Sequence, residues 1–419
     1  MNNEITAMEH AKEIILAAEA EANDVYARIE NTEHINQERV LNAFQNNNVS
    51  ARHFTPSYGY GYDDISRDKL DSVFAEVFGA EDALVRPQIV SGTHALFLAL
   101  SGILKPGETL LSVTGKPYDT LEKAIGIGTN EFGSLLSYGI NYKAVELTSE
   151  FKIDLASLQS ELDSDNTIKV VYIQRSRGYA WRDSINSEQI KDVCRITHAK
   201  KNCIVMLDNC YGEFTDSCEP TSYGVDIAAG SLIKNPGGGI APTGGYICGK
   251  HELIEQTANK LTVPGMGREV GSYADSYQPF YQGLFMAPHV TANALKTSVL
   301  FARAFEIMGM ETLPAFDAQR NDIVQSIRFK DAESLIAFCK TIQAASPIDS
   351  NVVPEPWDMP GYSNQVIMAA GSFVQGSSIE LSADAPICEP YTAYIQGSLT
   401  YSHGRIAATR AIAALLNNA

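Results

Sequence analysis

The strongest constraint on the fold of this chain is a pair of short apolar strands with a helix between them. The strands are Ile168–Ile173 and Ile204–Leu207, which are apolar, rich in β-branched residues and too short for core helices. The helix between them should start near Asn186, because Gln189 follows at the spacing of a capping box. Strands that alternate with helices predict a mainly parallel sheet covered by helices on both faces.

The same alternation continues on both sides of this pair. Before it, the sequence predicts helices over 68–78 and 94–103 and strands over 83–85 and 109–113. After it, an apolar helix should run from about Pro288 to Gly309. Strands should then follow at 323–329, 366–370 and 378–382, with a final helix at 406–416. This later part predicts a smaller C-terminal α/β domain.

The chain has 419 residues, whereas a single hydrophobic core usually stops growing at ~250–300 residues. Apolar residues at helical spacing predict one helix over 5–30 and a second over 31–45. We therefore expect an N-terminal helical arm at 1–55, a large domain at 56–290 and a small domain at 291–419.

Charge and composition exclude several classes of protein. The net charge is −18, so a nucleic acid or an anionic membrane surface is not an expected partner. No run reaches ~18 consecutive apolar residues, and the first residues have neither a basic nor an apolar leader segment. The seven cysteines include no C-x-x-C pair. These features predict a cytoplasmic protein with reduced thiols and no metal site.

Three features in order indicate a phosphate-bearing ligand. Ser91-Gly92-Thr93 opens a helix, where free N–H groups and the helix dipole can bind phosphate. Asp208 ends a strand, at the edge where open α/β sheets bind ligands. Lys234 follows an apolar strand and precedes Gly237-Gly-Gly239, so an apolar pocket there would lower its pKa and make it a nucleophile. Taken singly, these residues could equally be an N-cap, a turn aspartate and a solvated loop lysine.

One competing motif is a nucleotide-binding P-loop. Gly244-x4-Gly249-Lys250 has its spacing, but His251 stands where that motif needs Ser or Thr for magnesium. The interior Tyr246–Cys248 also has the pattern of a strand, which argues against the loop.

Longer stretches of the sequence resemble a known family. They are the segments 58–67, 90–94, 115–120, 174–179, 233–239, 288–290 and 379–386. Over roughly residues 10–415 the chain resembles the cystathionine β-lyase-like, methionine γ-lyase-like enzymes associated with aluminium resistance. These are fold-type I enzymes of the pyridoxal 5′-phosphate (PLP) superfamily, with a mainly parallel sheet between helices and a smaller C-terminal α/β domain.

The resemblance implies a role for each matching residue. Lys234 would form the internal aldimine with PLP, and Asp208 would keep the pyridine nitrogen protonated. Tyr118 would stack on the ring, unless it is a packed core tyrosine. The phosphate would lie on Ser91, Gly92 and Thr93 with the Ser231 hydroxyl; Ile233 replaces the threonine that is usual in the family.

The resemblance also implies contacts from a neighbouring subunit and with the substrate. Tyr60 or Tyr62, together with Arg67, would reach the phosphate of the adjacent subunit, which predicts a homodimer or homotetramer with shared active sites. The family's usual C-terminal arginine for the substrate carboxylate is missing, because the comparable run reads Glu380-Leu-Ser-Ala. Arg177 and Arg405 are the candidates to replace it.

The predicted activity is that of a PLP-dependent carbon–sulfur lyase. It would act on a small sulfur-containing amino acid by β- or γ-elimination, through the Lys234 aldimine and a quinonoid. Aminotransfer, racemisation or aldol cleavage on the same fold stays open, as does a PLP-binding protein without turnover. A phosphate-binding protein that does not use PLP is a further alternative.

Overall fold

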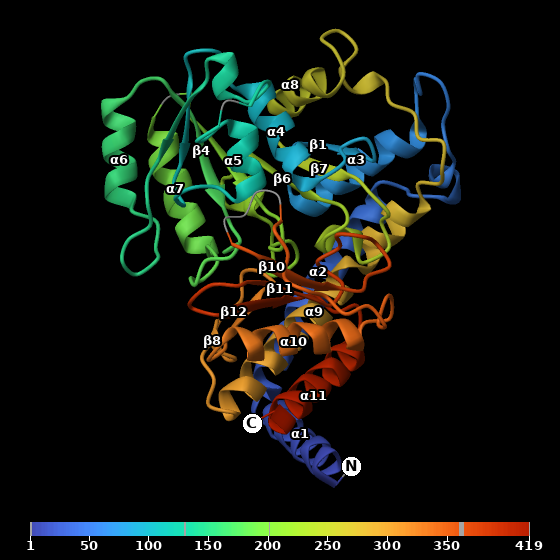
Figure 1. The fold of residues 1–419 in the computed structure, drawn as a ribbon. Coiled ribbons are helices and arrows are strands. Elements are labelled where there is room, and N and C mark those ends of the chain that lie inside the picture. Colours follow the sequence, from blue (N-terminus) through green and yellow to red (C-terminus); the bar gives the residue numbers. More distant parts are fainter. Residues whose placement is uncertain (1, 130, 201, 360–363, 419) are drawn as a thin grey trace.

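The fold combines two sheets joined by long helices, as the computed structural model of the chain shows (Figure 1). The structure describes residues 2–129, 131–200, 202–359 and 364–418. Within these residues the strands form a seven-stranded sheet and a five-stranded sheet. None of the helices described is long and apolar enough to cross a membrane.

The seven-stranded sheet is mainly parallel, as the sequence predicts. Its order is β1-β7-β6-β5-β4-β2-β3, and β7 runs antiparallel to both of its neighbours. The strands are β1 Asp82–Arg86, β2 Thr109–Ser112, β3 Asn141–Ala144, β4 Ile168–Gln174, β5 Ile204–Asp208, β6 Ile227–Ser231 and β7 Gly245–Gly249. The segment with P-loop spacing is therefore a buried strand, and its interior carries no phosphate-binding loop.

Helices cover both faces of this sheet. One face packs against α4 Gly92–Ile103, α5 Asp119–Ile125 and α8 His251–Leu261. The other packs against α6 Leu155–Ser164 and α7 Ser187–Ala199, and near β1 and β7 against α3 Ile65–Phe78. The predicted capping box of α7 is confirmed, because the Asn186 side chain accepts from the Gln189 N–H and the Gln189 side chain accepts from the Asn186 N–H.

Two predicted helix boundaries in the arm and in the central helix are wrong. The arm consists of α1 Asn2–Glu21 and α2 Asn23–Asn46, so the break lies at the buried Ala22 and not at residue 30. The central helix α9 spans Gln278–Ile307 and includes Pro288 in its interior. Helices α2 and α9 run side by side from the first sheet to the second (Figure 1). The predicted domain boundary at 290/291 falls inside α9.

The five-stranded sheet is antiparallel, in the order β10-β11-β12-β9-β8. Its strands are β8 Thr312–Leu313, β9 Gln325–Arg328, β10 Val366–Ala370, β11 Ser382–Pro386 and β12 Thr392–Gln396. Helices α10 Ala332–Ala345 and α11 Tyr401–Asn418 pack on one face together with α1 and α9. The strand predicted at 378–382 is wrong: β11 begins where that prediction ends. Short 3-10 turns lie at Ala51–Phe54, Leu136–Tyr138, Pro220–Tyr223, Asn235–Gly237 and Gly267–Glu269.

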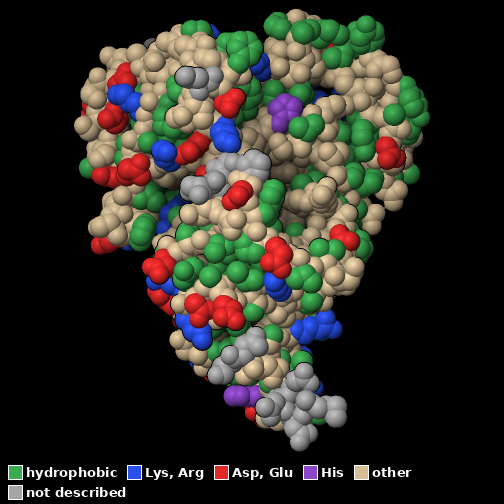
Figure 2. Space-filling model, viewed as in Figure 1, with side chains coloured by type: hydrophobic (Ala, Val, Ile, Leu, Met, Phe, Trp, Pro, Cys, Tyr) green, Lys and Arg blue, Asp and Glu red, His purple; other side chains and the backbone are tan. Residues whose placement is uncertain are grey.

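Among the side chains that Figure 2 colours by type, the face shown has no extended basic region. Blue Lys and Arg side chains there are scattered among acidic and uncharged ones. This distribution agrees with the net charge of −18.

Candidate active site

A cavity of about 540 Å³ lies where the two sheets face one another. The carboxyl ends of β4, β5 and β6 open toward it, because parallel strands end at the same edge of a sheet. It is lined from the first sheet by residues that include Ser91, Gly92, Thr93, Tyr118, Arg177, Asp208, Tyr211, Ser231 and Lys234. From the second sheet it is lined by Met368, Asp384, Tyr394 and Gln396. The residues predicted to bind the cofactor of their own chain, Ser91, Gly92, Thr93, Tyr118, Asp208, Ser231 and Lys234, are thus brought together.

The phosphate-binding turn predicted at 91–93 is the first turn of α4. Ser91 is the N-cap, and its hydroxyl accepts from the His94 N–H at 3.1 Å. The Gly92 and Thr93 N–H groups precede any possible intrahelical acceptor, so they are available to a ligand. A Cβ on Gly92 would lie 3.1 Å from Cys210 Sγ and 3.5 Å from Ser231 Cβ. This close-walled turn beside the Ser231 hydroxyl fits a phosphate group.

Asp208 is a carboxylate enclosed at the end of β5. Its Oδ1 accepts from the Cys210 N–H at 3.0 Å, whereas the Tyr172 hydroxyl is 3.5 Å from Oδ2. Burial raises the pKa of Asp208, and the charge of Lys234 lowers it. An enclosed carboxylate with one well-bonded oxygen is suited to a cationic partner such as a protonated ring nitrogen.

Lys234 lies in the same cavity, but its electrostatic environment differs from the sequence prediction. Burial lowers the pKa of Lys234, whereas Cys210, Tyr211, Asp208 and Tyr118 raise it, and the net direction is upward. The predicted lowering by an apolar pocket is therefore wrong for the chain by itself. The physical reason is the set of groups around Nζ, with Cys210 and Tyr211 raising the pKa of Lys234 most and Asp208 adding to them.

Tyr211 is a site residue that the sequence analysis missed. The Lys234 Nζ lies 3.7 Å from the centroid of the Tyr211 ring, the geometry of a cation–π contact. Tyr211 has φ of 71°, a strained conformation for a residue other than glycine. Its position three residues after Asp208, at the start of the β5 loop, was the available sequence signal.

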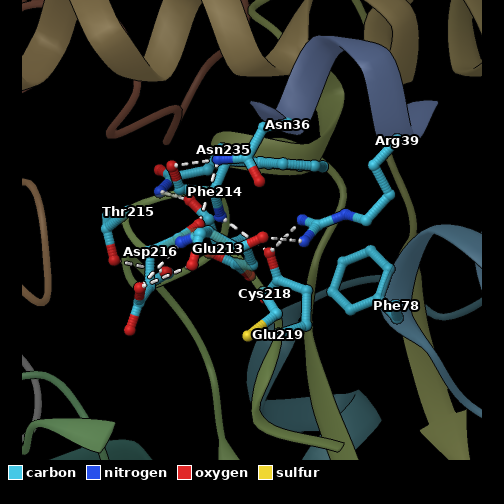
Figure 3. A network of polar contacts seen from close by, with 12 residues as sticks. Asn36, Arg39, Phe78, Glu213, Phe214, Thr215, Asp216, Cys218, Glu219 and Asn235 are labelled. Atoms are coloured by element: carbon cyan, nitrogen blue, oxygen red, sulfur yellow. Dashed lines mark hydrogen bonds and ion pairs between the residues drawn. The ribbon is translucent and has the colours of Figure 1, made fainter. Parts of the chain in front are cut away.

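The loop that carries Tyr211 is anchored from behind by a buried polar network (Figure 3). Asn36 of α2 donates to the carbonyls of Phe214 and Asp216, both at 3.0 Å. Glu219 accepts from the Phe214 N–H at 2.9 Å and from Arg39 of α2 at 3.2 Å. The arm thus fixes the loop that follows Asp208.

Tyr118 stands at the N-terminus of α5, beside the phosphate turn. Its hydroxyl is 2.8 Å from Thr93 Oγ1, and its N–H donates to Gln174 Oε1 at 2.9 Å. The ring lines the cavity and is partly exposed to it. This placement is compatible with the predicted stacking role.

Of the two arginines predicted to bind the substrate carboxylate, Arg177 lines the cavity and Arg405 is not among the described lining residues. Arg177 Nη1 donates to the Leu313 carbonyl at 2.8 Å, and Nη2 is 3.6 Å from Asp322 Oδ1. Arg405 forms a two-pronged ion pair with Glu19 of α1, so its guanidinium ties the arm to α11.

The residues predicted to serve a neighbouring subunit lie outside this cavity. Tyr60 and Tyr62 are mostly exposed, with ring centroids 5.5 Å apart. Arg67 is buried and donates to Asp68 at 2.8 Å and to the Gly61 carbonyl at 2.9 Å. A single chain does not test contacts between subunits, so this assignment stays a prediction.

One cluster of possible metal ligands was not predicted. Asp82, His251 and Glu255 bring ligand atoms within 4.8 Å of one another. Arg268 pairs with Asp82 at 2.9 Å and with Glu255 at 2.8 Å, so a cation already occupies this group.

Comparisons with known proteins extend the interpretation of this geometry. A family model described as methionine gamma-lyase matches residues 11–416. YnbB of Bacillus subtilis (strain 168), described as uncharacterized, is 50% identical over 418 residues, 99% of each chain. A carbon-sulfur lyase involved in aluminum resistance from Clostridium novyi NT is 50% identical. Its crystal structure has a TM-score of 0.93, with 97% of this chain and 96% of that chain covered.

Two distant structures share the fold. The pyridoxal-5′-phosphate dependent protein YhfS from Escherichia coli has a TM-score of 0.62 at 16% identity, covering 92% of this chain and 95% of its own. CalE6, a methionine gamma lyase from Micromonospora echinospora, has a TM-score of 0.57 at 16% identity, covering 87% and 93%. With the mainly parallel sheet, they confirm the predicted fold of the fold-type I PLP enzymes. The family model and the close relatives together show that this chain belongs to the methionine gamma-lyase family.

Proposed function

We propose that this protein is a PLP-dependent carbon–sulfur lyase that acts on a sulfur-containing amino acid. The observation that carries the proposal is the convergence, in one cavity, of Lys234, the Asp208 carboxylate, the turn at 91–93 and the Arg177 guanidinium. A lysine, a carboxylate and a helix N-terminus match the aldehyde, ring nitrogen and phosphate of one cofactor. Arg177 adds the group that a substrate carboxylate needs.

Each of these residues has a defined task in the proposal. Lys234 would hold the cofactor covalently through Nζ, Ser91–Thr93 with Ser231 would bind its phosphate, and Asp208 would pair with the ring nitrogen. When bound, PLP supplies a sink for the electron pair left at the substrate Cα. Arg177 orients the substrate by its carboxylate.

Proton movement falls to Lys234 Nζ. As a free amine, Lys234 Nζ would remove the Cα proton of the substrate, a general-base role worth ~10²–10⁴ in rate. The Tyr211 ring, 3.7 Å from Nζ, would stabilise the ammonium that forms when Nζ takes this proton. Elimination then breaks the carbon–sulfur bond, and the thiolate leaves with its electron pair. Elimination from Cβ is the simpler case, since departure from Cγ needs a second proton shift.

The proposal includes a homo-oligomer with shared active sites. Its support is the exposed position of Tyr60 and Tyr62, which are not among the residues described as lining the cavity of their own chain and which are open to contact with a neighbouring chain. Light scattering of the purified protein should give at least a dimer mass; a monomer with full activity contradicts this part.

The test is an absorbance spectrum of the protein with PLP, followed by assays for thiol and keto acid with cysteine, cystathionine, methionine and homocysteine. We expect a violet band and stoichiometric release of both products from at least one substrate. Lys234→Ala should lose the band and turnover together, whereas Lys191→Ala, on an exposed face of α7, should lose neither. Retention of both by Lys234→Ala would refute the proposal.

A further inference from the structure

The second sheet places a carboxylate in the active-site cavity. Asp384 of β11 lies directly opposite Met368 of β10 and Tyr394 of β12 in the antiparallel register. Facing residues in such a ladder share one side of the sheet, and all three line the cavity. The cavity wall contributed by the small domain is therefore an acidic group between a thioether and a phenol.

Few groups of the protein compensate the charge of Asp384. Gln396 Nε2 donates to its Oδ2 at 3.2 Å, and the Tyr179 side chain also contacts it. Burial raises the pKa of Asp384 to about 6, against the lowering effect of these two hydrogen bonds. Among the ion pairs of the described residues, none includes Asp384; the charge of Lys234 lowers its pKa without a direct ion pair. An enclosed carboxylate is costly unless it meets a cation.

The charged groups that the proposed function uses have partners in it: Asp208 would pair with the ring nitrogen, Lys234 would hold the cofactor and Arg177 would bind the substrate carboxylate. Lys116 and Asp119 also line the cavity, and the charges of Lys123 and Lys116 act on Asp119. Asp384 has no ion pair among those of the described residues and no partner in the proposed function. A substrate that brings a second cation would supply it.

We propose that Asp384 binds an ammonium group on the leaving-thiol half of the substrate. The substrate class is then an S-substituted cysteine with an amine beyond the sulfur, of which cystathionine is one member. This inference rests on the proposed function and adds its specificity. Met368 and Tyr394 beside the carboxylate give the methylene groups of such a substrate an apolar path. A thioether that ends in a methyl group would leave Asp384 without its cation.

Two substrates of the same length test this directly. S-(2-aminoethyl)-L-cysteine and S-propyl-L-cysteine differ by an ammonium in place of a methyl group. β-Elimination with water converts each to pyruvate, ammonia and the corresponding thiol. We expect kcat/KM to favour the aminoethyl substrate at least about tenfold, the lower range for a hydrogen bond to a charged group. A preference for the propyl substrate would overturn the inference.

The isosteric variant Asp384→Asn should reduce the ratio of the two kcat/KM values about tenfold. The matched control is Glu380→Gln: this small-domain carboxylate is buried, accepts from the Phe373 and Val374 N–H groups and is not a cavity-lining residue among those described. The control should keep the wild-type ratio. If Asp384→Asn slows both substrates equally, Asp384 serves the α-amino group or the fold, and the inference is wrong.

A binding measurement separates this inference from the proposed function. L-Lysine and L-2-aminoheptanoate carry the same side chains with carbon in place of sulfur, so no thiol can leave. Calorimetry on the PLP-loaded protein should show at least about tenfold tighter binding of lysine, and Asp384→Asn should abolish that difference. Equal affinities overturn the role of Asp384. If lysine binds more tightly but no thiol is released from either cysteine derivative, the lyase proposal fails instead.

Discussion

Glu219 offers the sharpest test of how the arm supports the active site. Its side chain is 1% exposed, and it accepts from Phe214 N–H at 2.9 Å and Arg39 Nη2 at 3.2 Å on Oε1. Its Oε2 accepts at 3.1 Å from Nδ2 of Asn209, the residue that follows Asp208 in the sequence. Glu219→Gln keeps the shape of the side chain but removes the charge.

The expected cost follows from these contacts. A glutamine that keeps its oxygen toward Phe214 turns its NH2 group toward the Asn209 NH2 group, so two buried donors face one another. One unsatisfied buried donor costs ~1–3 kcal/mol, and breaking a buried charge pair costs ~3–5 kcal/mol. Because Arg39 keeps some contact with water, we expect a loss of about 3 kcal/mol in the free energy of unfolding.

Urea denaturation measures this loss, with Glu161→Gln as the matched control. Glu161 pairs with Lys143 at 2.8 Å, but both side chains are more than a third exposed, so its loss should cost under ~1 kcal/mol. The Glu219→Gln protein should also bind PLP more weakly, because the loop that bears Asn209 and Tyr211 loses its anchor. Equal unfolding free energies for the two variants would refute the reasoning.

Three further predictions concern the cavity. Arg177→Met should retain the violet cofactor band but raise KM for amino acid substrates about 100-fold, the loss of one charged hydrogen-bond pair; a KM within threefold of wild type would exclude Arg177 as the carboxylate ligand. For the aminoethyl substrate, kcat/KM should rise with pH through about 6, because Asp384 is protonated below this pKa and ionised above it. Lys234 and Tyr179 also act on the Asp384 carboxyl group, but they are the same for both substrates and cannot cause a difference between the two pH profiles. The propyl substrate should therefore show no rise of kcat/KM near pH 6. A rise shared by both substrates would mean that another group titrates there. Gly92→Ala should weaken PLP binding about tenfold, since its Cβ would stand 3.1 Å from Cys210 Sγ in the phosphate turn; an unchanged dissociation constant would place the phosphate elsewhere.

The large-domain site was predictable because its strands are short, apolar and parallel. Asp208 and Ser231 each end such a strand, and parallel strands bring their carboxyl ends to one edge. The small-domain wall was harder to predict. β11 reads Ser-Ala-Asp-Ala-Pro and has none of the β-branched or aromatic residues that mark a strand. The sequence therefore did not predict that these residues form a strand or that Asp384 faces the cavity.

The choice between arginines depended on tertiary structure. Arg405 and Arg177 are equivalent as sequence letters, and only the packing of α1 against α11 shows that Glu19 engages Arg405. The helix break at Ala22 carried no Gly or Pro signal, since a buried alanine suits a helix interior as well as its end. Tyr211 depends on a backbone conformation that no local pattern specifies.

The central claim is that Lys234 is the residue that holds PLP. Borohydride reduction of the PLP-loaded protein fixes the cofactor on its lysine, and mass spectrometry of the peptides then locates the added pyridoxyl phosphate group. We predict modification at Lys234 near one group per chain, and none in Lys234→Ala. A stoichiometric modification on another lysine, or no modification of a protein that releases thiol from its substrate, would contradict the account.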